Sequence, residues 1–356
     1  WLFPRMSAAT AALLGLGFMA AITALSLVLW SRFDMVVPLG LPLAFTALLF
    51  LLQLLYGYFV ESRGKREVTR LFGQYVPPEV VDEMAENPED ISMEGETREL
   101  TVLFSDVRGF TTISEGLDSK ELSELMNEFL TPLTRVIHDH RGTIDKYMGD
   151  AIMAFWGAPL DDPDHARHAL QAAMDMLRAV RALDDRFKAR GWPALNIGVG
   201  LNTGPMSVGN MGSEFRVAYT VMGDAVNLGS RLEGQTKQYG VEIIVSESTR
   251  AAVPEFAYRE LDRIRVKGKR EPVTIYEPLG LKETLSEAVR SDLGRYRQAL
   301  RYYRAQSWDQ AEAEFFGLQQ SGRSHAVYGL YLDRIAAYRS HPPGENWDGV
   351  YTATSK

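Results

Sequence analysis

The chain contains no cysteine among its 356 residues, which excludes disulfide bonds and thiol chemistry. It also lacks an excess of basic residues, because 38 Lys and Arg stand against 46 Asp and Glu, a net charge of −8. A nucleic-acid-binding protein normally presents a basic face, so this balance argues against nucleic acid as a partner. The length is sufficient for two or three compact units.

Charged residues are scarce at the start of the chain. Only three occur among the first sixty residues: Arg5, Arg32 and Asp34. The stretches Ser7–Trp30 and Val36–Val60 are apolar over 24 and 25 residues, and about 20 residues suffice to cross a bilayer. We therefore expect two transmembrane helices within residues 1–60. Because the chain begins at Trp1 rather than Met, we also expect further protein upstream.

A basic cluster follows the second apolar run: Arg63, Lys65, Arg66 and Arg70. Positive charge next to a membrane helix marks the cytoplasmic side of that helix. This pattern predicts a multi-pass protein of the cell (inner) membrane, with its remaining domains in the cytoplasm.

Residues 61–97 are predicted to form a cytoplasmic stalk helix and a polar linker. Apolar side chains recur at helical spacing over Glu61–Tyr75, which favours pairing with a second copy as a parallel coiled coil. Folding back onto the next domain is the alternative. The prolines at positions 77 and 78 end this helix, and a short helix is expected over Pro78–Glu86.

Strands and helices alternate over residues 98–280. The order β-α-β-β-α-β is typical of an α+β sandwich of ferredoxin type. The pattern predicts a helix over Ser119–Asp139, with Ser119 as its cap, and a hairpin turn at Tyr147–Asp150. It also predicts two strands, Ile197–Asn202 and Met206–Gly209, on either side of a Gly-Pro turn.

Residues 285–341 carry helical periodicity and many aromatic side chains. Spacings such as Tyr296-x-x-Ala299-Leu300 resemble tetratricopeptide helices, although there is room for barely two helix pairs. We expect a small all-α tail. Its aromatic residues serve either a protein partner or internal packing, and the sequence leaves both open.

Two acidic residues follow predicted strands in the central region. Asp106 comes after the apolar strand Leu100–Phe104, and Asp150 lies 44 residues later, in the hairpin turn. In a β-α-β-β unit the first strand lies beside the hairpin, so both carboxylates can meet at one sheet edge. Such a pair suits Mg²⁺ or Mn²⁺ that carries a nucleotide phosphate. Taken alone, either residue is explained as well by a turn or a helix cap.

A second group of candidates carries an amide and positive charge. Asn227 and Arg231 are four residues apart and share a helix face, and Lys267 lies at a predicted strand end. An amide that orients a sugar, beside cations that take developing negative charge, suits phosphoryl transfer. Helix pairs and surface salt bridges explain each of these residues when it is taken alone.

Four segments together resemble the class III nucleotide cyclases: Phe104–Thr111, Asp145–Asp150, Tyr219–Glu233 and Val266–Gly268. The resemblance covers about residues 95–280, and it implies a ferredoxin-like catalytic domain that acts as a homodimer on ATP. It implies that Asp106 and Asp150 hold two Mg²⁺ or Mn²⁺ ions, with the Val107 carbonyl assisting. It also implies phosphate binding by a set of amides and one cation: Gly109, Phe110, Thr111 and Lys267.

By the same resemblance, Asn227 would place the ribose and Arg231 would stabilise the transition state as the 3′-oxygen attacks the α-phosphorus. The base would be read by Lys146 and Thr220. A Lys donor and a Thr acceptor match adenine, whereas guanine reverses both edges. We therefore expect an adenylate cyclase. A guanylate cyclase and a catalytically inactive regulatory dimer of the same fold are the alternatives.

The N-terminal part resembles a narrower group, the bacterial membrane-bound cyclases in which a CHASE-type sensor precedes three membrane helices. Residues 1–60 would then be the last two of these helices. The resemblance rests on hydropathy and on the order of the segments.

Overall fold

The structure is a computed structural model that describes residues 8–35, 38–52, 72–73, 75–86, 95–213, 215–265, 271–321, 325–344 and 346–352. It divides into two compact units. The first comprises Trp1–Gly73 and Val81–Pro88, and the second comprises Gln74–Val80 and Glu89–Lys356.

The first unit contains helix α1 (Ala8–Phe33) and a helical stretch over residues 40–52. The two lie side by side, since a Cβ on Gly15 would come within 3.7 Å of the Phe50 ring. No helix in the described parts of the chain has both the length and the apolar character needed to cross a membrane. The prediction of two membrane-spanning helices is therefore not supported. The stalk helix predicted over 61–75 lies almost wholly outside the described residues.

The second unit is built on a mixed sheet, which has nine strands in the described residues, in the order β2-β3-β1-β4-β6-β8-β7-β9, with β5 paired to β4. The strands are β1 (Glu96–Val107), β2 (Thr143–Met148), β3 (Ala151–Trp156), β4 (Ile197–Ser213), β5 (Arg216–Met222), β6 (Ile243–Ser246), β7 (Phe256–Arg265), β8 (Val273–Leu281) and β9 (Tyr351–Thr352). Strand β1 pairs antiparallel with both β3 and β4, which places it between the hairpin and the rest of the sheet.

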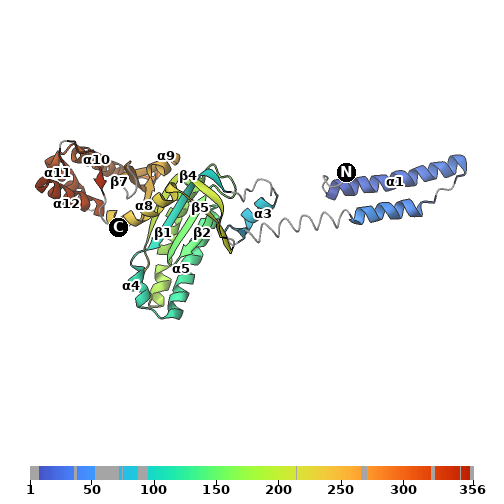
Figure 1. Cartoon of the computed structure of the whole chain (residues 1–356), viewed down its shortest axis with the longest axis horizontal. Helices are drawn as coiled ribbons and strands as arrows, with labels where there is room; N and C mark the ends of the chain where they lie inside the picture. Colours follow the sequence, from blue (N-terminus) through green and yellow to red (C-terminus); the bar gives the residue numbers. More distant parts are fainter. Residues whose placement is uncertain are drawn as a thin grey trace. The chain divides into compact units, whose positions relative to one another are not determined.

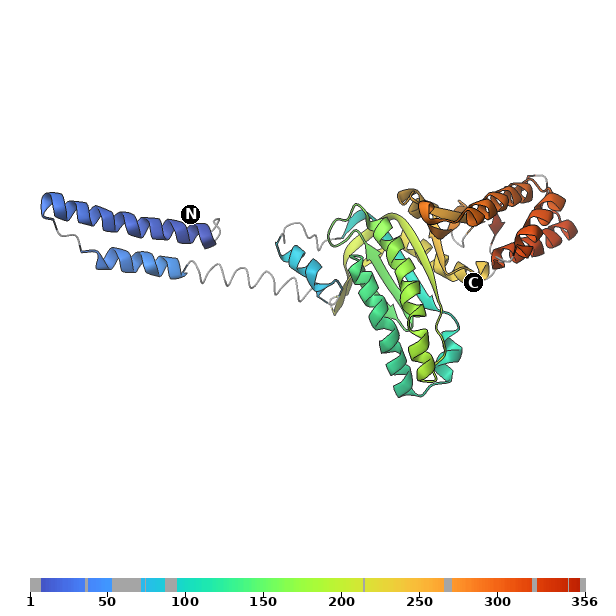
Figure 2. The same cartoon turned by 180° about the vertical axis from the view of Figure 1, so that it is seen from behind.

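Helices cover both faces of this sheet. The helices of the second unit are α4 (Phe110–Glu115), α5 (Ser119–Asp139), α6 (His165–Arg181), α7 (Asp184–Ala189), α8 (Asp224–Tyr239), α9 (Glu247–Ala252), α10 (Glu287–Arg304), α11 (Trp308–Gln320) and α12 (Ala326–Ser340), with a 3-10 turn at Lys282–Thr284. Helix α3 (Pro78–Glu86) is divided between the two units. Figure 2 shows α5 and α6 lying across one face. The α+β architecture expected from the sequence is confirmed.

Strand β1 shows how alternation assigns side chains to the two faces. Leu103 and Val107 belong to the core beneath α5 and α6. Val102 points the other way, toward α8, where a Cβ on Gly229 would lie 2.7 Å from its Cγ1 atom. A Cβ on Gly200 would lie 2.6 Å from the Gly229 carbonyl oxygen. Helix α8 can rest this closely on β1 and β4 only because both positions are glycine.

Residues 197–213 form one continuous strand, so the prediction of two strands around a Gly-Pro turn was wrong. The pairing with β1 runs without a break from Glu96↔Val208 to Val107↔Ile197. On the opposite edge, β6 pairs only with Val199–Leu201, and β5 begins to pair only at Ser207. Pro205 therefore lies where one edge of β4 is unpaired, and a strand tolerates proline there.

The helical tail, α10 to α12, packs against α8 and the strands β6, β7 and β8 (Figure 1). Five of its aromatic side chains are buried in a core shared with α8, β6, β7 and β8: Tyr296, Tyr303, Phe315, Tyr328 and Tyr331. Of the two roles left open by the sequence, packing is the one that these five residues have. The tail therefore shares a hydrophobic core with α8 and these three strands.

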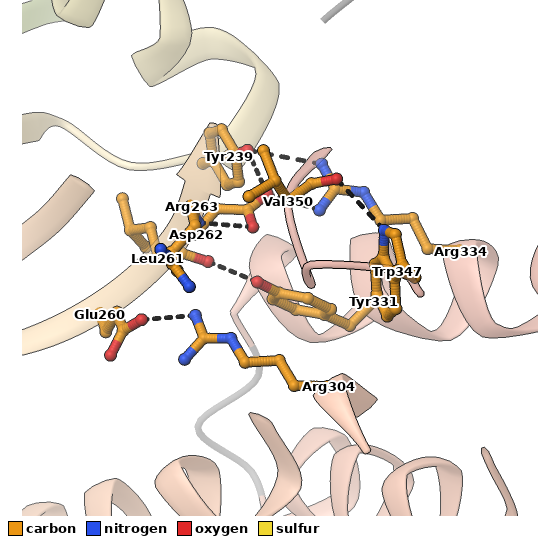
Figure 3. A network of polar contacts seen from close by, with 10 residues as sticks. All are labelled: Tyr239, Glu260, Leu261, Asp262, Arg263, Arg304, Tyr331, Arg334, Trp347 and Val350. Carbon is orange, nitrogen blue, oxygen red and sulfur yellow. Dashed lines mark hydrogen bonds and ion pairs between the residues drawn. The ribbon is translucent and has the colours of Figure 1, made fainter. Parts of the chain in front are cut away.

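Polar contacts fix the tail to α8 and β7 (Figure 3). Asp262 on β7 accepts hydrogen bonds at 2.6 Å from Arg334 of α12 and from the Tyr239 hydroxyl of α8. Tyr331 donates to the Leu261 carbonyl at 2.7 Å. Because Asp262 and Arg334 are both buried, loss of either partner would leave an uncompensated charge in the core. The network joins the tail to the helix that carries Asn227.

Candidate active site

Asp106 and Asp150 meet at one edge of the sheet. Asp106 is the penultimate residue of β1, and Asp150 follows Gly149, whose φ of +69° makes the tight β2–β3 turn. The Val107 N–H donates to Asp150 at 3.2 Å, and the two carboxyl groups share a hydrogen bond. Burial, that hydrogen bond and repulsion from Asp150 raise the pKa of Asp106 to about 6. Two carboxyl groups held this closely do not ionise independently.

Two residues to which the sequence pattern assigned no role join this pair. Arg108 follows the strand end, and its side chain donates to Thr236 on α8. Glu233 comes from the same helix, and burial together with the charge of Asp106 raises its pKa to about 7. The signal for Glu233 was its place at the end of the Tyr219–Glu233 segment. Its proximity to Asp106 depends on the close packing of α8 on the sheet.

The backbone turn after Arg108 prepares a set of amides beside the carboxylates. Gly109 has a φ of +68° and caps α4 without any side-chain hydrogen bond to the helix. Phe110 and Thr111 begin this helix, where backbone N–H groups have no partner within the helix itself. Their predicted contact with phosphate stays a prediction.

Lys146 and Thr220 are brought together by a third residue, Asp145. The Lys146 ammonium lies 3.1 Å from one carboxylate oxygen of Asp145, whose side chain is almost fully buried. The Thr220 hydroxyl donates to the other oxygen, which also accepts from the Val221 N–H at 3.4 Å. Asp145 begins the Asp145–Asp150 segment, and the sequence pattern assigned it no role. Its partner on β5 is 75 residues away in the chain, which no local pattern reveals.

Asn227 and Arg231 lie on α8, on a face different from that of Glu233. Glu233 is two residues beyond Arg231, a rotation of about 200° around the helix. The Arg231 Nη1 atom is buried and has no hydrogen-bond partner in the described part of the structure. A buried donor without a partner is costly unless a ligand satisfies it.

Lys267 lies outside the described residues.

The family model of the adenylate and guanylate cyclase catalytic domain matches residues 93–277. The chain belongs to this family. The match includes every site residue named above and agrees with the resemblance to class III cyclases drawn from the four motifs. The narrower CHASE-linked group stays a prediction.

Curated relatives and solved structures of the family are similar to this chain. Adenylate cyclase 1 of Rhizobium meliloti is 34% identical over 217 residues, which are 61% of this chain and 33% of the relative. Adenylate cyclase of Anabaena cylindrica is 38% identical over 213 residues, 58% of this chain and 42% of the relative. The chain thus matches less than half the length of either relative.

Two crystal structures cover the cyclase domain. A guanylyl cyclase is 36% identical with a TM-score of 0.51, over 55% of this chain and 98% of that structure. The adenylyl cyclase CyaB from P. aeruginosa is 35% identical with a TM-score of 0.50, over 54% of this chain and 100% of that structure. Because one is a guanylyl and the other an adenylyl cyclase, the fold does not decide which base is bound.

Class III cyclases use divalent metal ions, and the carboxylates of this chain fit such an ion. Asp106 and Asp150 repel each other when both are ionised, and a cation between them would relieve that repulsion. In the described residues, no group of three or more Asp, Glu or His side chains could hold a metal ion. Magnesium sites with nucleotides normally combine one or two carboxylates with phosphate oxygens and water. The protein would therefore supply two carboxylate ligands, and the substrate would supply others. The assisting role of the Val107 carbonyl stays a prediction.

Metal affinity should depend on pH through Asp106. Its carboxyl has a raised pKa of about 6, so it is ionised above that pH and protonated below it. Because a metal ligand must be deprotonated, protons compete with the metal as the pH falls. We expect the Kd for Mn²⁺, measured by electron paramagnetic resonance without nucleotide, to rise about tenfold between pH 7 and pH 5. An affinity that stays constant over this range would contradict the assignment of Asp106.

Proposed function

We propose that the chain is an adenylate cyclase, which converts ATP to 3′,5′-cyclic AMP and pyrophosphate. The observation that carries this choice of base is that Asp145 forms an ion pair with Lys146 and accepts a hydrogen bond from Thr220. The adenylate cyclases among the curated relatives support the same choice.

Asp145 fixes the hydrogen-bonding direction of the Thr220 hydroxyl. That hydroxyl gives its single proton to Asp145, so only its lone pairs remain for a base. An acceptor at this position pairs with the 6-amino group of adenine and opposes the 6-oxygen of guanine. The Lys146 ammonium, which is about half exposed, keeps further protons for the N1 acceptor of adenine. Guanine carries a proton at N1 and would meet a donor there.

The reaction forms a bond between the ribose 3′-oxygen and the α-phosphorus and breaks the bond from that phosphorus to the bridging oxygen. Asp106 and Asp150 would hold two Mg²⁺ or Mn²⁺ ions. The chemistry these ions would supply is a lower pKa for the 3′-hydroxyl and neutralisation of the leaving pyrophosphate. Asn227 would orient the ribose. The unpartnered nitrogen of Arg231 would take up the charge that develops on the phosphorus oxygens.

The proposed active site is shared between two copies of the chain. Glu233 marks the side of α8 that lies toward Asp106. Asn227 and Arg231 lie about 120° and 160° around the helix from Glu233, by the 100° step of an α-helix. They therefore point away from the carboxylates of their own chain. A homodimer with twofold symmetry would bring them to the carboxylates of the partner.

Anchoring in the inner membrane, with the cyclase domain in the cytoplasm, stays a proposal that rests on the sequence alone. Its support is the order of two apolar runs and the basic cluster that begins at Arg63.

Base choice provides the test. The purified chain, assayed with ATP and GTP in competition, should favour ATP, and Lys146→Glu combined with Thr220→Cys should move the kcat/KM ratio toward GTP. Each mispaired group costs roughly 1–3 kcal/mol, so we expect a shift of at least about 30-fold for the two groups together.

A matched pair of single variants isolates the hydroxyl of Thr220. Thr220→Ser keeps the oxygen that donates to Asp145 and should retain the preference for ATP. Thr220→Val has the same shape without that oxygen, so it should lose about tenfold or more in kcat/KM for ATP. If Ser and Val behave alike, and the double variant leaves the ratio unchanged, these positions do not read the base.

A further inference from the structure

A cavity of about 530 Å³ lies between the sheet and the tail, away from the carboxylate pair. It is lined by the end of α9, the start of β7, the 3-10 turn that begins at Lys282, and α10 as far as Arg297. Four of its lining residues are cations, and the described lining contains no carboxylate: Arg250, Lys282, Arg290 and Arg297. In a chain whose net charge is −8, this is a local concentration of uncompensated positive charge.

None of these four cations is neutralised by a described acidic group. Arg290 is held by backbone carbonyls, donating to Lys282 at 2.8 Å and to Leu285 at 3.2 Å. Arg250 lies 4.7 Å from the centre of the Tyr276 ring and makes no ion pair within the described residues. Glu255, the acidic residue just before the β7 wall, is paired with Arg167 at 2.6 Å. Neutral partners thus hold two guanidinium groups in place and leave their charges free for a ligand.

The rim and the floor of the cavity differ in character. The four cations are exposed at the rim, whereas Phe256 and Tyr258 are buried in the floor. Small-molecule sites commonly have volumes of about 300–1,000 Å³ and combine an apolar lining with a few charged groups. Arginine is well suited to phosphate because its planar fork matches two phosphate oxygens.

We propose that this cavity binds an organic phosphate, an anion with at least two negative charges and an apolar or aromatic body. The phosphate would lie on the cationic rim and the body on the floor formed by Phe256 and Tyr258. This site is separate from the proposed catalytic site, and its existence does not depend on the proposed function.

Calorimetric titration of the full chain tests the proposal. The titration is done in EDTA, so that binding dependent on divalent ions does not contribute. Three probes separate charge from apolar contact: AMP, inorganic pyrophosphate and adenosine. We expect AMP and pyrophosphate to bind and adenosine not to bind. Failure of both anions to bind the unaltered chain would overturn the proposal, and binding of pyrophosphate without AMP would overturn the organic class of the ligand.

Variants locate the binding. Lys282→Ala with Arg297→Ala removes two charges whose side chains make no hydrogen bond or ion pair in the described structure, so the fold should be retained. We expect the Kd for AMP to rise about tenfold or more. Arg301 is exposed on the same helix α10 and lies outside the cavity lining. Arg301→Ala is therefore the matched control, and its Kd for AMP should be unchanged. An equal loss in both variants would mean a general charge effect and would overturn the site.

One more variant separates this site from the catalytic one. Arg231→Ala should lower cyclase activity while the Kd for AMP in EDTA stays unchanged. If Arg231→Ala abolishes the binding of AMP, the anion lies in the catalytic site and the cavity is not its binding site.

Discussion

Asp106→Asn should lower kcat by about 10³-fold or more, in keeping with the loss of a group that stabilises the transition state through a metal. Asp106 and Asp150 are the two carboxylates at this sheet edge, and they share a hydrogen bond. Removing one leaves a single negative charge, too little to hold two divalent ions. Asp150→Asn should have the same effect. The measurement is the rate of cyclic AMP formation by purified protein with saturating ATP and Mn²⁺.

The stability of the metal-free protein should change in the opposite direction. Burial and Asp150 raise the pKa of Asp106 to about 6 in the folded chain, above its ordinary value near 3.8. At pH 7 the ionised Asp106 therefore lowers the free energy of unfolding. This penalty shrinks as the pH falls from about 6 toward 4, because the carboxyl becomes protonated in the folded chain. Asn removes that charge, so the Tm without metal should be unchanged or higher. An inactive variant that is also destabilised would indicate loss of the fold rather than loss of a ligand.

A control with the same chemical change separates charge from position. Asp185 is exposed on α7, remote in the chain from both carboxylates. Asp185→Asn removes the same charge and should keep full activity. Near-normal turnover of Asp106→Asn would contradict the metal assignment.

Co-expression of Asp106→Asn with Arg231→Ala should recover about one quarter of wild-type activity, although each variant alone is inactive. Random pairing makes half of the dimers heterodimers. In each heterodimer one site carries both defects and the other carries neither, because twofold symmetry builds every site from both chains. One intact site in half of the dimers gives one quarter of the sites overall.

Two different affinity tags make this experiment decisive, since they isolate the heterodimers before the assay. The isolated heterodimer should have about half of the wild-type activity per dimer. A heterodimer that forms but stays inactive would mean that each site belongs to a single chain. In that case the orientation of Arg231 away from Asp106 on α8 would need another explanation.

The sequence by itself determined most of the local structure in the cyclase domain. Helices α3 and α5 have the predicted bounds, because hydrophobic periodicity and turn residues are local signals. The helix cap is one residue earlier than predicted. Asp118, rather than Ser119, accepts the first N–H groups, and Glu121 completes a capping box. Family membership was also within reach of the sequence, since several short motifs occur in the correct order.

Other features were decided only when distant segments met. The Gly-Pro pair in β4 has the local signal of a turn, and the unbroken ladder with β1 overrides it. The buried state of the tail aromatics depends on α8 and β7, which lie far earlier in the chain. Aromatic residues at helical spacing predict that one face of the helix is buried. The spacing does not show whether that face packs against a partner protein or against the protein's own sheet.

The site itself divides in the same way. The sequence identified residues whose chemistry is carried by their type and spacing, such as Asp106 and Arg231. It did not identify Asp145 and Glu233 as members of the site, because their roles come from contacts. Asp145 acts on Thr220 across 75 residues, and Arg108 reaches Thr236 across 128. Sequence motifs determine which groups are present, whereas tertiary packing decides which groups orient them, because burial and hydrogen bonding arise only after the chain has folded.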